Sequence, residues 1–251
     1  MVKVAIGRHI RKLGNTRVLV GPSVRRVTRR PSKIKLSKAR KIKAQIKSLK
    51  DPNIERGFGI NKGLNTSKVA TGVNREVEIK GLGSTKNLVG SAHNHPQNFA
   101  PPSTEDLALY ARQNKSTNYV LSNDGTVFRV SPGNTLNKEK TQSLINRVNA
   151  LTSRNPLLET RDPQHATNIA QMSILKKLDE RGIIKFKVRP TKEFKDYMEK
   201  SKADIDLVEK SDFFKDVVYE INAFRKEQQA ESKARLARAA KVKDLFLDDL
   251  F

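Results

Sequence analysis

Two histidines and an aspartate in the segment GSAHNHPQNFAPPSTEDL have the types and spacing of metal ligands. His93 and His95 are separated by one residue, and Asp106 follows eleven positions after His95. Residues two apart on a β-strand lie on the same face, so a strand here presents both imidazoles to one ion. A carboxylate from the next element completes a His2Asp set. The fourth position is left for water, which is the arrangement of a catalytic zinc site.

The flanking residues predict the elements that must position these ligands. The apolar run NLVGSAHNH predicts a strand that carries both histidines and ends before Pro96. The stretch PPSTEDLALYARQN predicts a helix in which Ser103 is the N-cap and Asp106 is three residues further on, a capping-box spacing with Asp in place of Glu. The motif is therefore expected to run from strand through loop to helix.

The same kind of pattern organises the chain from residue 33 to residue 131. Apolar residues at helical spacing predict a basic amphipathic helix over 33–50, and IERGFGIN and REVEIKG alternate like strands. NYVLSNDGTVFRV has two β-rich arms around an Asn-Asp-Gly turn, which predicts a hairpin. The order is helix, strands, helix, hairpin. We therefore expect an α/β domain of about a hundred residues.

The remaining chain, 132–251, is expected to be a mostly helical extension. Helices are predicted over 138–152 and 163–181, with a short strand or extended connector at IIKFKVRP, and one long helical pattern runs from 203 to about 243. An apolar stripe on that pattern is typical of a packing or oligomer face. The chain closes on the acidic and apolar sequence DLFLDDLF.

Charge is unevenly distributed along the 251 residues. The net charge is +24, yet residues 1–50 hold seventeen Lys or Arg and no acidic residue. Such a region is typical of polyanion binding, with nucleic acid as the expected partner and a solvated tail as the alternative. Residues 1–32 are expected to form an extended basic arm. With no cysteine, thiolate metal sites and disulfides are excluded.

No stretch is apolar enough to predict a membrane span, and the first residues lack the apolar run of a signal peptide. We therefore expect a cytoplasmic or virion-associated protein that is not secreted by a signal peptide and has no membrane partner.

The motif resembles a known family. H-x-H, seven residues, then S-x-x-D is the signature of the JAMM (MPN+) zinc metalloproteases, and His93, His95, Ser103 and Asp106 match it at every position. The wider string HNHP…PPSTED is most similar to the RadC-like and phage-type branches. The resemblance covers about residues 33–131 and implies an MPN-type, cytidine-deaminase-like mixed sheet flanked by helices. It also implies hydrolysis of peptide or isopeptide bonds in a protein substrate.

The resemblance further implies two catalytic residues. The family uses an upstream glutamate as general base, and Glu55 fits best because it follows the predicted helix and begins ERGFGI. Glu76 and Glu78 are the alternatives. Ser103 would support the oxyanion, as its counterpart does in the family.

Three other interpretations stay open at this point. The histidines could be ordinary surface or core residues. The domain could keep the metal ligands but serve as a scaffold in a larger assembly, such as a phage particle, and contact other protein subunits. A Ser-His-Asp triad is a weaker alternative, because no G-x-S-x-G elbow surrounds Ser103.

Overall fold

The structure is a computed structural model, and it divides the chain into two compact units, Met1–Lys41 and Ile42–Phe251. The residues it describes are 2–6, 9–13, 16–20, 23–27, 33–72, 88–112, 117–133 and 138–248. Glu76, Glu78 and the predicted strand REVEIKG lie outside these ranges.

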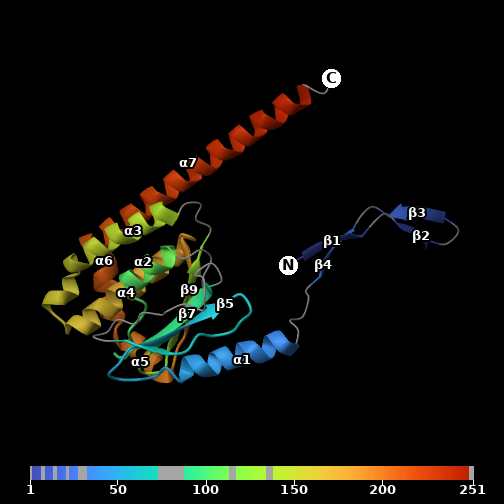
Figure 1. Ribbon diagram of the computed structural model, residues 1–251. Coiled ribbons are helices and arrows are strands. Elements are labelled where there is room, and N and C mark those ends of the chain that lie inside the picture. Colours follow the sequence, from blue (N-terminus) through green and yellow to red (C-terminus); the bar gives the residue numbers. More distant parts are fainter. Residues whose placement is uncertain are drawn as a thin grey trace. The chain divides into compact units, whose positions relative to one another are not determined.

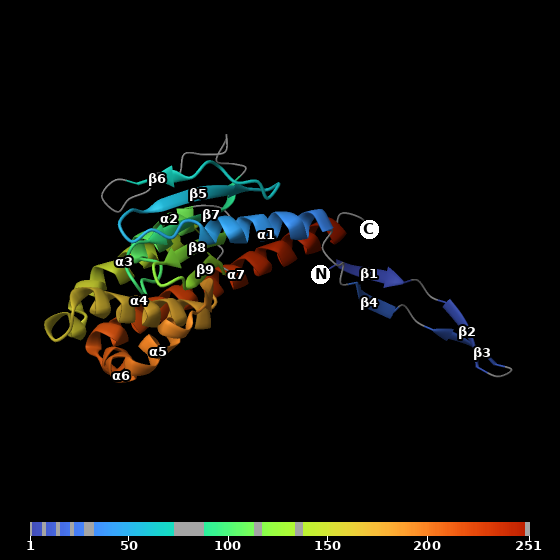
Figure 2. The same cartoon turned by 90° about the horizontal axis from the view of Figure 1, so that it is seen from below.

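The larger unit is built on a mixed sheet of six strands in the order β10-β9-β8-β7-β5-β6 (Figures 1 and 2). Only β7 and β8 pair in parallel; the other neighbours are antiparallel. The strands are β5 (Arg56–Asn61), β6 (Ala70–Thr71), β7 (Leu88–His95), β8 (Thr117–Ser122), β9 (Val127–Pro132) and β10 (Ile184–Arg189).

Seven α-helices are described in the structure. They are α1 (Lys33–Lys47), α2 (Thr104–Arg112), α3 (Lys138–Leu151), α4 (Pro163–Glu180), α5 (Lys192–Lys200), α6 (Lys202–Lys210) and α7 (Asp212–Asp248). The helices expected at 33–50, after Ser103, at 138–152 and at 163–181 are therefore confirmed. The expectation of an α/β fold with a mixed sheet flanked by helices is confirmed as well. None of the described helices combines the length and the apolar character needed to cross a membrane.

The sheet separates two hydrophobic cores, because successive residues of a strand point to opposite faces. On one face, Phe58, Ala92 and Leu121 pack with Ile42 and Ile46 of α1. On the other face, Val120 and Phe128 belong to a larger core that reaches into α2 to α7. α1 therefore covers one face of the sheet, and the remaining helices cover the other.

The sheet continues across residue 131, where the sequence suggested that the α/β domain ends. β10 pairs with β9 along its whole length, from Ile184 opposite Pro132 to Arg189 opposite Val127. The segment expected to be a strand or a connector is thus the edge strand of the sheet. Its alternating residues bury Phe186 in the larger core, so the C-terminal half shares a core with the sheet.

The prediction of one long helix over 203–243 is wrong at one point. Ser211 has an extended backbone (φ −70°, ψ 158°) that separates α6 from α7. Its hydroxyl donates to the carbonyl of Val208 (2.6 Å) and accepts from the amide of Phe214 (3.2 Å). A serine at this position caps the second helix, and the helical spacing of the apolar residues hides the break.

The basic N-terminal arm contains more strand structure than the sequence suggested. β1 (Val2–Ile6) pairs with β4 (Ser23–Val27), and β2 (His9–Leu13) pairs with β3 (Thr16–Val20), both antiparallel. Val2 lies opposite Val27 and His9 lies opposite Val20, so both strand pairs fit one continuous antiparallel register.

Candidate metal centre

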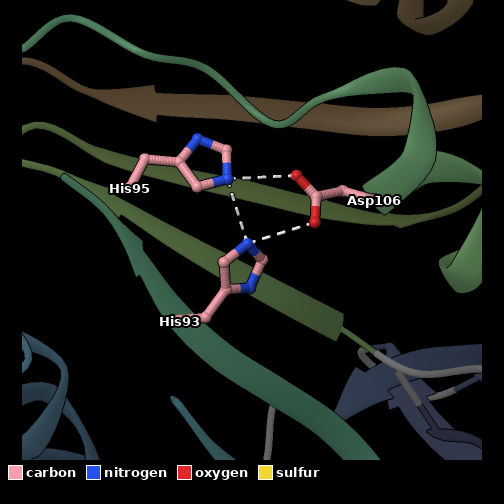
Figure 3. A group of neighbouring side chains, drawn as sticks. All are labelled: His93, His95 and Asp106. Atoms are coloured by element: carbon pink, nitrogen blue, oxygen red, sulfur yellow. Dashed lines mark hydrogen bonds and ion pairs between the residues drawn. The ribbon is translucent and has the colours of Figure 1, made fainter. Parts of the chain in front are cut away.

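The three predicted metal ligands converge on one point (Figure 3). His93 and His95 project from the same face of β7, and Asp106 faces them from the first turn of α2. All three side chains are mostly buried, with exposed fractions of 8%, 11% and 16%. Among the residues that the structure describes, they form the one group of His, Cys, Asp and Glu side chains that could hold a metal ion.

The distances between the candidate ligand atoms are compatible with a zinc site. The two Nε2 atoms lie 3.2 Å apart, His93 Nε2 lies 3.1 Å from Asp106 Oδ1, and His95 Nε2 lies 3.2 Å from Asp106 Oδ2. Zinc bonds of about 2.0–2.1 Å at tetrahedral angles separate ligand atoms by about 3.3 Å. An ion above this nearly equilateral triangle would keep its fourth position open. The donor set, two imidazoles and one carboxylate, is also one that zinc accepts.

The electrostatics of Asp106 favour its ionised form. Burial by itself would raise the pKa of this carboxyl, but the charge of His93 and the hydrogen bonds from both histidines hold the pKa well below its usual range. An ionised carboxylate is the form that binds a cation.

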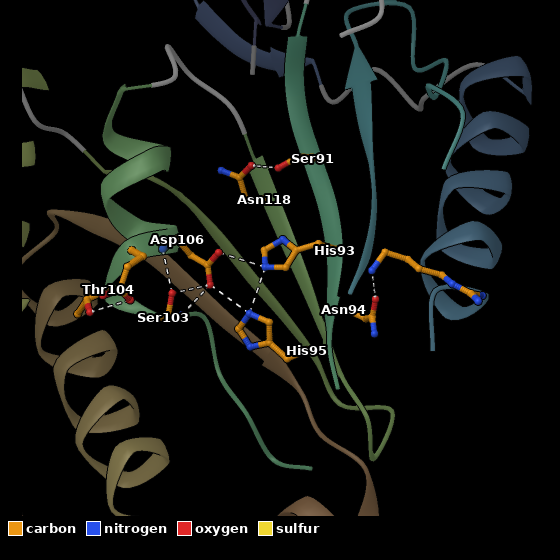
Figure 4. Close-up of polar contacts among 10 residues, drawn as sticks. Ser91, His93, Asn94, His95, Ser103, Thr104, Asp106 and Asn118 are labelled. Carbon is orange, nitrogen blue, oxygen red and sulfur yellow. Dashed lines mark hydrogen bonds and ion pairs between the residues drawn. The ribbon is translucent and has the colours of Figure 1, made fainter. Parts of the chain in front are cut away.

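Ser103 and Asp106 form the predicted capping box at the start of α2 (Figure 4). The Ser103 amide donates to Asp106 Oδ2 (2.7 Å), and the Asp106 amide donates to Ser103 Oγ (3.0 Å). The Ser103 hydroxyl also donates to Asp106 Oδ2 (3.0 Å). Ser103 therefore orients the carboxylate ligand, and an oxyanion contact would require its hydroxyl to rotate away from Asp106.

Glu55, the glutamate favoured as general base, directly precedes β5. Gly57, two residues after Glu55, lies opposite His93 in the antiparallel pairing of β5 and β7, and the register of these two strands begins at that pair. Residues opposite each other in an antiparallel pair share a face. The Glu55 carbonyl accepts from the amide of Gly72 (2.8 Å), which extends the pairing of β5 with β6. Strand alternation carried back by two residues from Gly57 predicts that Glu55 lies on the same sheet face as the two histidines.

The loop between His95 and α2 is anchored to the sheet and to α5. Ser122 Oγ donates to the carbonyl of Gln97 and accepts from the amide of Ala100, both at 3.1 Å. Phe99 has a left-handed backbone (φ +60°), and its ring stacks on Tyr197 with centroids 4.4 Å apart. These contacts hold the path of the chain from the strand ligands to Asp106.

The sequence interpretation passed over Asn94, the residue between the two histidines. It is buried on the opposite face of β7 and bonds to the segment before β5. An asparagine between two strand histidines points to the other face of the sheet, and if that face is buried its amide needs hydrogen-bond partners. This polar residue in the H-x-H motif is the sequence signal that could have identified it.

Comparison with known proteins adds nothing to this geometry: no family model, no curated protein and no solved structure matches the chain. Any assignment of function therefore rests on the motif and on the arrangement of its residues.

Proposed function

We propose that this protein is a JAMM-type zinc-dependent hydrolase of peptide or isopeptide bonds, with an MPN-type domain at about residues 33–131. The observation that supports the proposal best is the triangle of ligand atoms from His93, His95 and Asp106, whose edges of 3.1–3.2 Å suit a tetrahedral ion with one open position. The strand-loop-helix order around the triangle agrees with the motif.

The residues around the ligands have distinct roles in this proposal. A zinc ion bound there would supply Lewis-acid activation of a water molecule and of the scissile carbonyl. Glu55 takes a proton from the attacking water as its oxygen bonds to the carbonyl carbon. Glu55 then returns that proton to the amine nitrogen as the carbon–nitrogen bond breaks. Ser103 orients Asp106 and, with its hydroxyl rotated, supports the oxyanion.

The test is metal analysis of the full chain purified without chelators, combined with cleavage of fluorescein-labelled casein as a peptide-bond reporter. We expect about one zinc per chain and cleavage that is lost on chelation and restored by added zinc. Less than a tenth of an equivalent of zinc after incubation with excess zinc and dialysis would overturn the proposal.

A second candidate function is that of an assembly component that binds nucleic acid through its basic arm. In the arm, Lys3 lies opposite Arg26 and Lys12 opposite Arg17 in the strand register. Like charges directly opposite each other destabilise a strand pair, so an anionic partner would relieve the repulsion. This second proposal also includes a location in the cytoplasm or in a virion and contacts between the protein and other subunits of the assembly.

The two candidate functions are separated by a His93→Ala/His95→Ala double variant. The enzyme proposal predicts that processing of the protein substrate is lost while assembly of the particle proceeds. Unchanged processing and assembly without the metal ligands would leave the assembly role standing and contradict the enzymatic one.

A further inference from the structure

Asn94 connects the strand of the two histidines to the segment that carries Glu55. The residue, drawn in Figure 4, is 1% exposed, and the hydrogen bonds of its side chain go to residues 51–56. Oδ1 accepts from the backbone amide of Arg56 (2.6 Å), and Nδ2 donates to the carbonyls of Asp51 and Ile54 (both 3.1 Å). Both donor hydrogens of the amide are used, so this buried polar group is well satisfied.

These three bonds surround Glu55 on both sides. Backbone pairing of β5 with β7 is recorded as far as Gly57 opposite His93. At the next position the Arg56 amide donates to the Asn94 side chain, so a side-chain hydrogen bond connects the two segments there. The carbonyl of Glu55 itself is bound by Gly72 from the other neighbour. The backbone around Glu55 is therefore hydrogen-bonded on both sides. Gly72 bonds to it on the β6 side, and the Asn94 side chain bonds to it on the β7 side.

The alternation of side chains along β7 explains how Asn94 can connect the histidines to the segment around Glu55. His93 and His95 point to one face of β7, so Asn94 between them points to the other. The same three consecutive residues thus hold the candidate metal ligands and the segment that precedes β5. The Asn94 side chain thus links the strand of the candidate ligands directly to the backbone next to Glu55, although Arg56 and Asn94 are 38 positions apart.

We infer that Asn94 is a positioning residue, which fixes the backbone of Glu55 relative to the two histidine ligands so that the base faces the attacking water. The inference rests on the proposed hydrolase function. A second set of contacts supports it: Asp51 accepts from the amides of Asn53 and Ile54 and pairs with Arg56 (2.9 Å), which closes the same segment into a compact turn. Misplacement of a catalytic group by about 1 Å costs on the order of 100-fold in rate.

The experiment uses the full chain with Asn94→Ala, Glu55→Gln and the double variant. We expect Asn94→Ala to bind zinc as the wild type does and to exchange its Arg56 amide at least about 10-fold faster. On fluorescein-labelled casein, kcat should fall by about 100-fold with KM changed less than about 3-fold. Added to Glu55→Gln, the Asn94→Ala change should cost nothing further, because it acts through the base that is already lost.

The control and the second variant distinguish positioning from general stability. Asn155 is another buried amide, with bonds to the carbonyl of Ala166 and the amide of Leu157, and Asn155→Ala should lower stability without changing kcat. Asn94→Thr suits a strand and removes the side-chain amide. It replaces Asn94→Ala in the same measurements if Asn94→Ala does not fold.

Three outcomes overturn the inference: an unchanged exchange rate at Arg56, an unchanged kcat despite faster exchange, or an equal loss of kcat with and without Glu55. Failure of the proposed function is a different result, in which the wild type binds no zinc or the zinc-loaded wild type does not cleave casein. Exchange at the Arg56 amide then still decides whether Asn94 holds the segment.

Discussion

At the scale of single residues, Asp106 serves two structural purposes with one carboxylate. Oδ2 accepts from the amide and hydroxyl of Ser103 as a helix cap, while both oxygens face the histidines. The cap fixes the rotamer, and the charge of His93 and the hydrogen bonds from both histidines favour the ionised form in spite of burial. As a metal ligand, Asp106 would thus be oriented before an ion arrives, which would lower the cost of binding one.

Asp106→Asn separates these two purposes. Asparagine keeps an oxygen that can accept from the Ser103 amide, but it removes the charge of the ligand. We expect the helix cap to persist and zinc affinity to fall by at least about 100-fold, measured by metal analysis and competition with a chelator. Glu105→Gln removes an exposed charge from the same turn of α2 and should bind zinc normally. Equal zinc content in both variants would contradict the ligand assignment.

Glu55→Gln tests the base in the same way. The amide cannot accept the proton, so kcat should fall by about 100-fold to 10,000-fold while zinc stays bound. The matched comparisons are Glu76→Gln and Glu78→Gln, the two alternatives from the sequence. Full activity of Glu55→Gln, with loss of activity in either of the others, would show that the base was assigned to the wrong glutamate.

At the scale of elements, the β8–β9 turn holds the loop that follows the histidines. Asp124 accepts from the hydroxyls of Thr126 (2.5 Å) and Thr191 (2.7 Å) and from the amide of Phe99 (3.3 Å). Burial raises the pKa of Asp124, but the hydrogen bonds from neighbouring hydroxyls and from this amide outweigh it and lower the pKa below the usual value. The Asp124 carboxylate therefore connects three parts of the structure: the β8–β9 hairpin, the start of α5 and the loop between His95 and α2.

Asp124→Asn should lower stability in a way that depends on pH. The folded-state pKa lies below the unfolded value of about 3.9, so the carboxylate contributes its full stability above about pH 5 and loses it as pH falls through the folded pKa. We expect a deficit of about 2 kcal/mol at pH 7, shrinking below pH 4, in urea unfolding. Asp196→Asn, an exposed aspartate of α5, should change stability by less than about 0.5 kcal/mol. A deficit for Asp124→Asn that is the same at pH 7 and pH 3 would rule out this account.

At the scale of the whole molecule, charge is distributed unequally between the two units. The unit Met1–Lys41 has no acidic residue, and the larger unit carries every acidic residue, the first being Asp51. The proposed nucleic-acid partner is consistent with this distribution, because a two-stranded ribbon fits the major groove of duplex DNA and opposed basic pairs such as Lys12 and Arg17 would be neutralised by phosphates.

Lys12→Glu tests this partner while preserving the ribbon. It places a glutamate opposite Arg17, and an opposite-charge pair stabilises paired strands by roughly 0.2–1 kcal/mol. Affinity for a labelled DNA duplex, measured by fluorescence anisotropy, should nevertheless fall roughly tenfold, and the salt dependence should lose about one phosphate contact. Lys176→Glu on α4 makes the same change in net charge and should matter less. If both variants bind alike, the arm is not the contact surface.

The sequence by itself determined the features that depend on neighbours a few positions away. The alternation of a strand put His93 and His95 on one face, the capping-box spacing brought Ser103 to Asp106, and Asn-Asp-Gly closed the hairpin with Gly125 at φ +96°. These are local rules of backbone geometry and hydrogen bonding, and they act before distant segments meet.

Only the tertiary structure decided which strands lie side by side. The pairing of β5 with β7 placed Gly57, two residues after Glu55, opposite His93 and gave Asn94 its partners, and β10 joined β9 across the expected end of the domain. Ser211 ended α6 although the apolar spacing continued past it. Strand order depends on which faces bury the most apolar surface together, and helix breaks depend on how two helices pack on one core. Both are set by contacts between residues far apart in the chain, which local periodicity does not record.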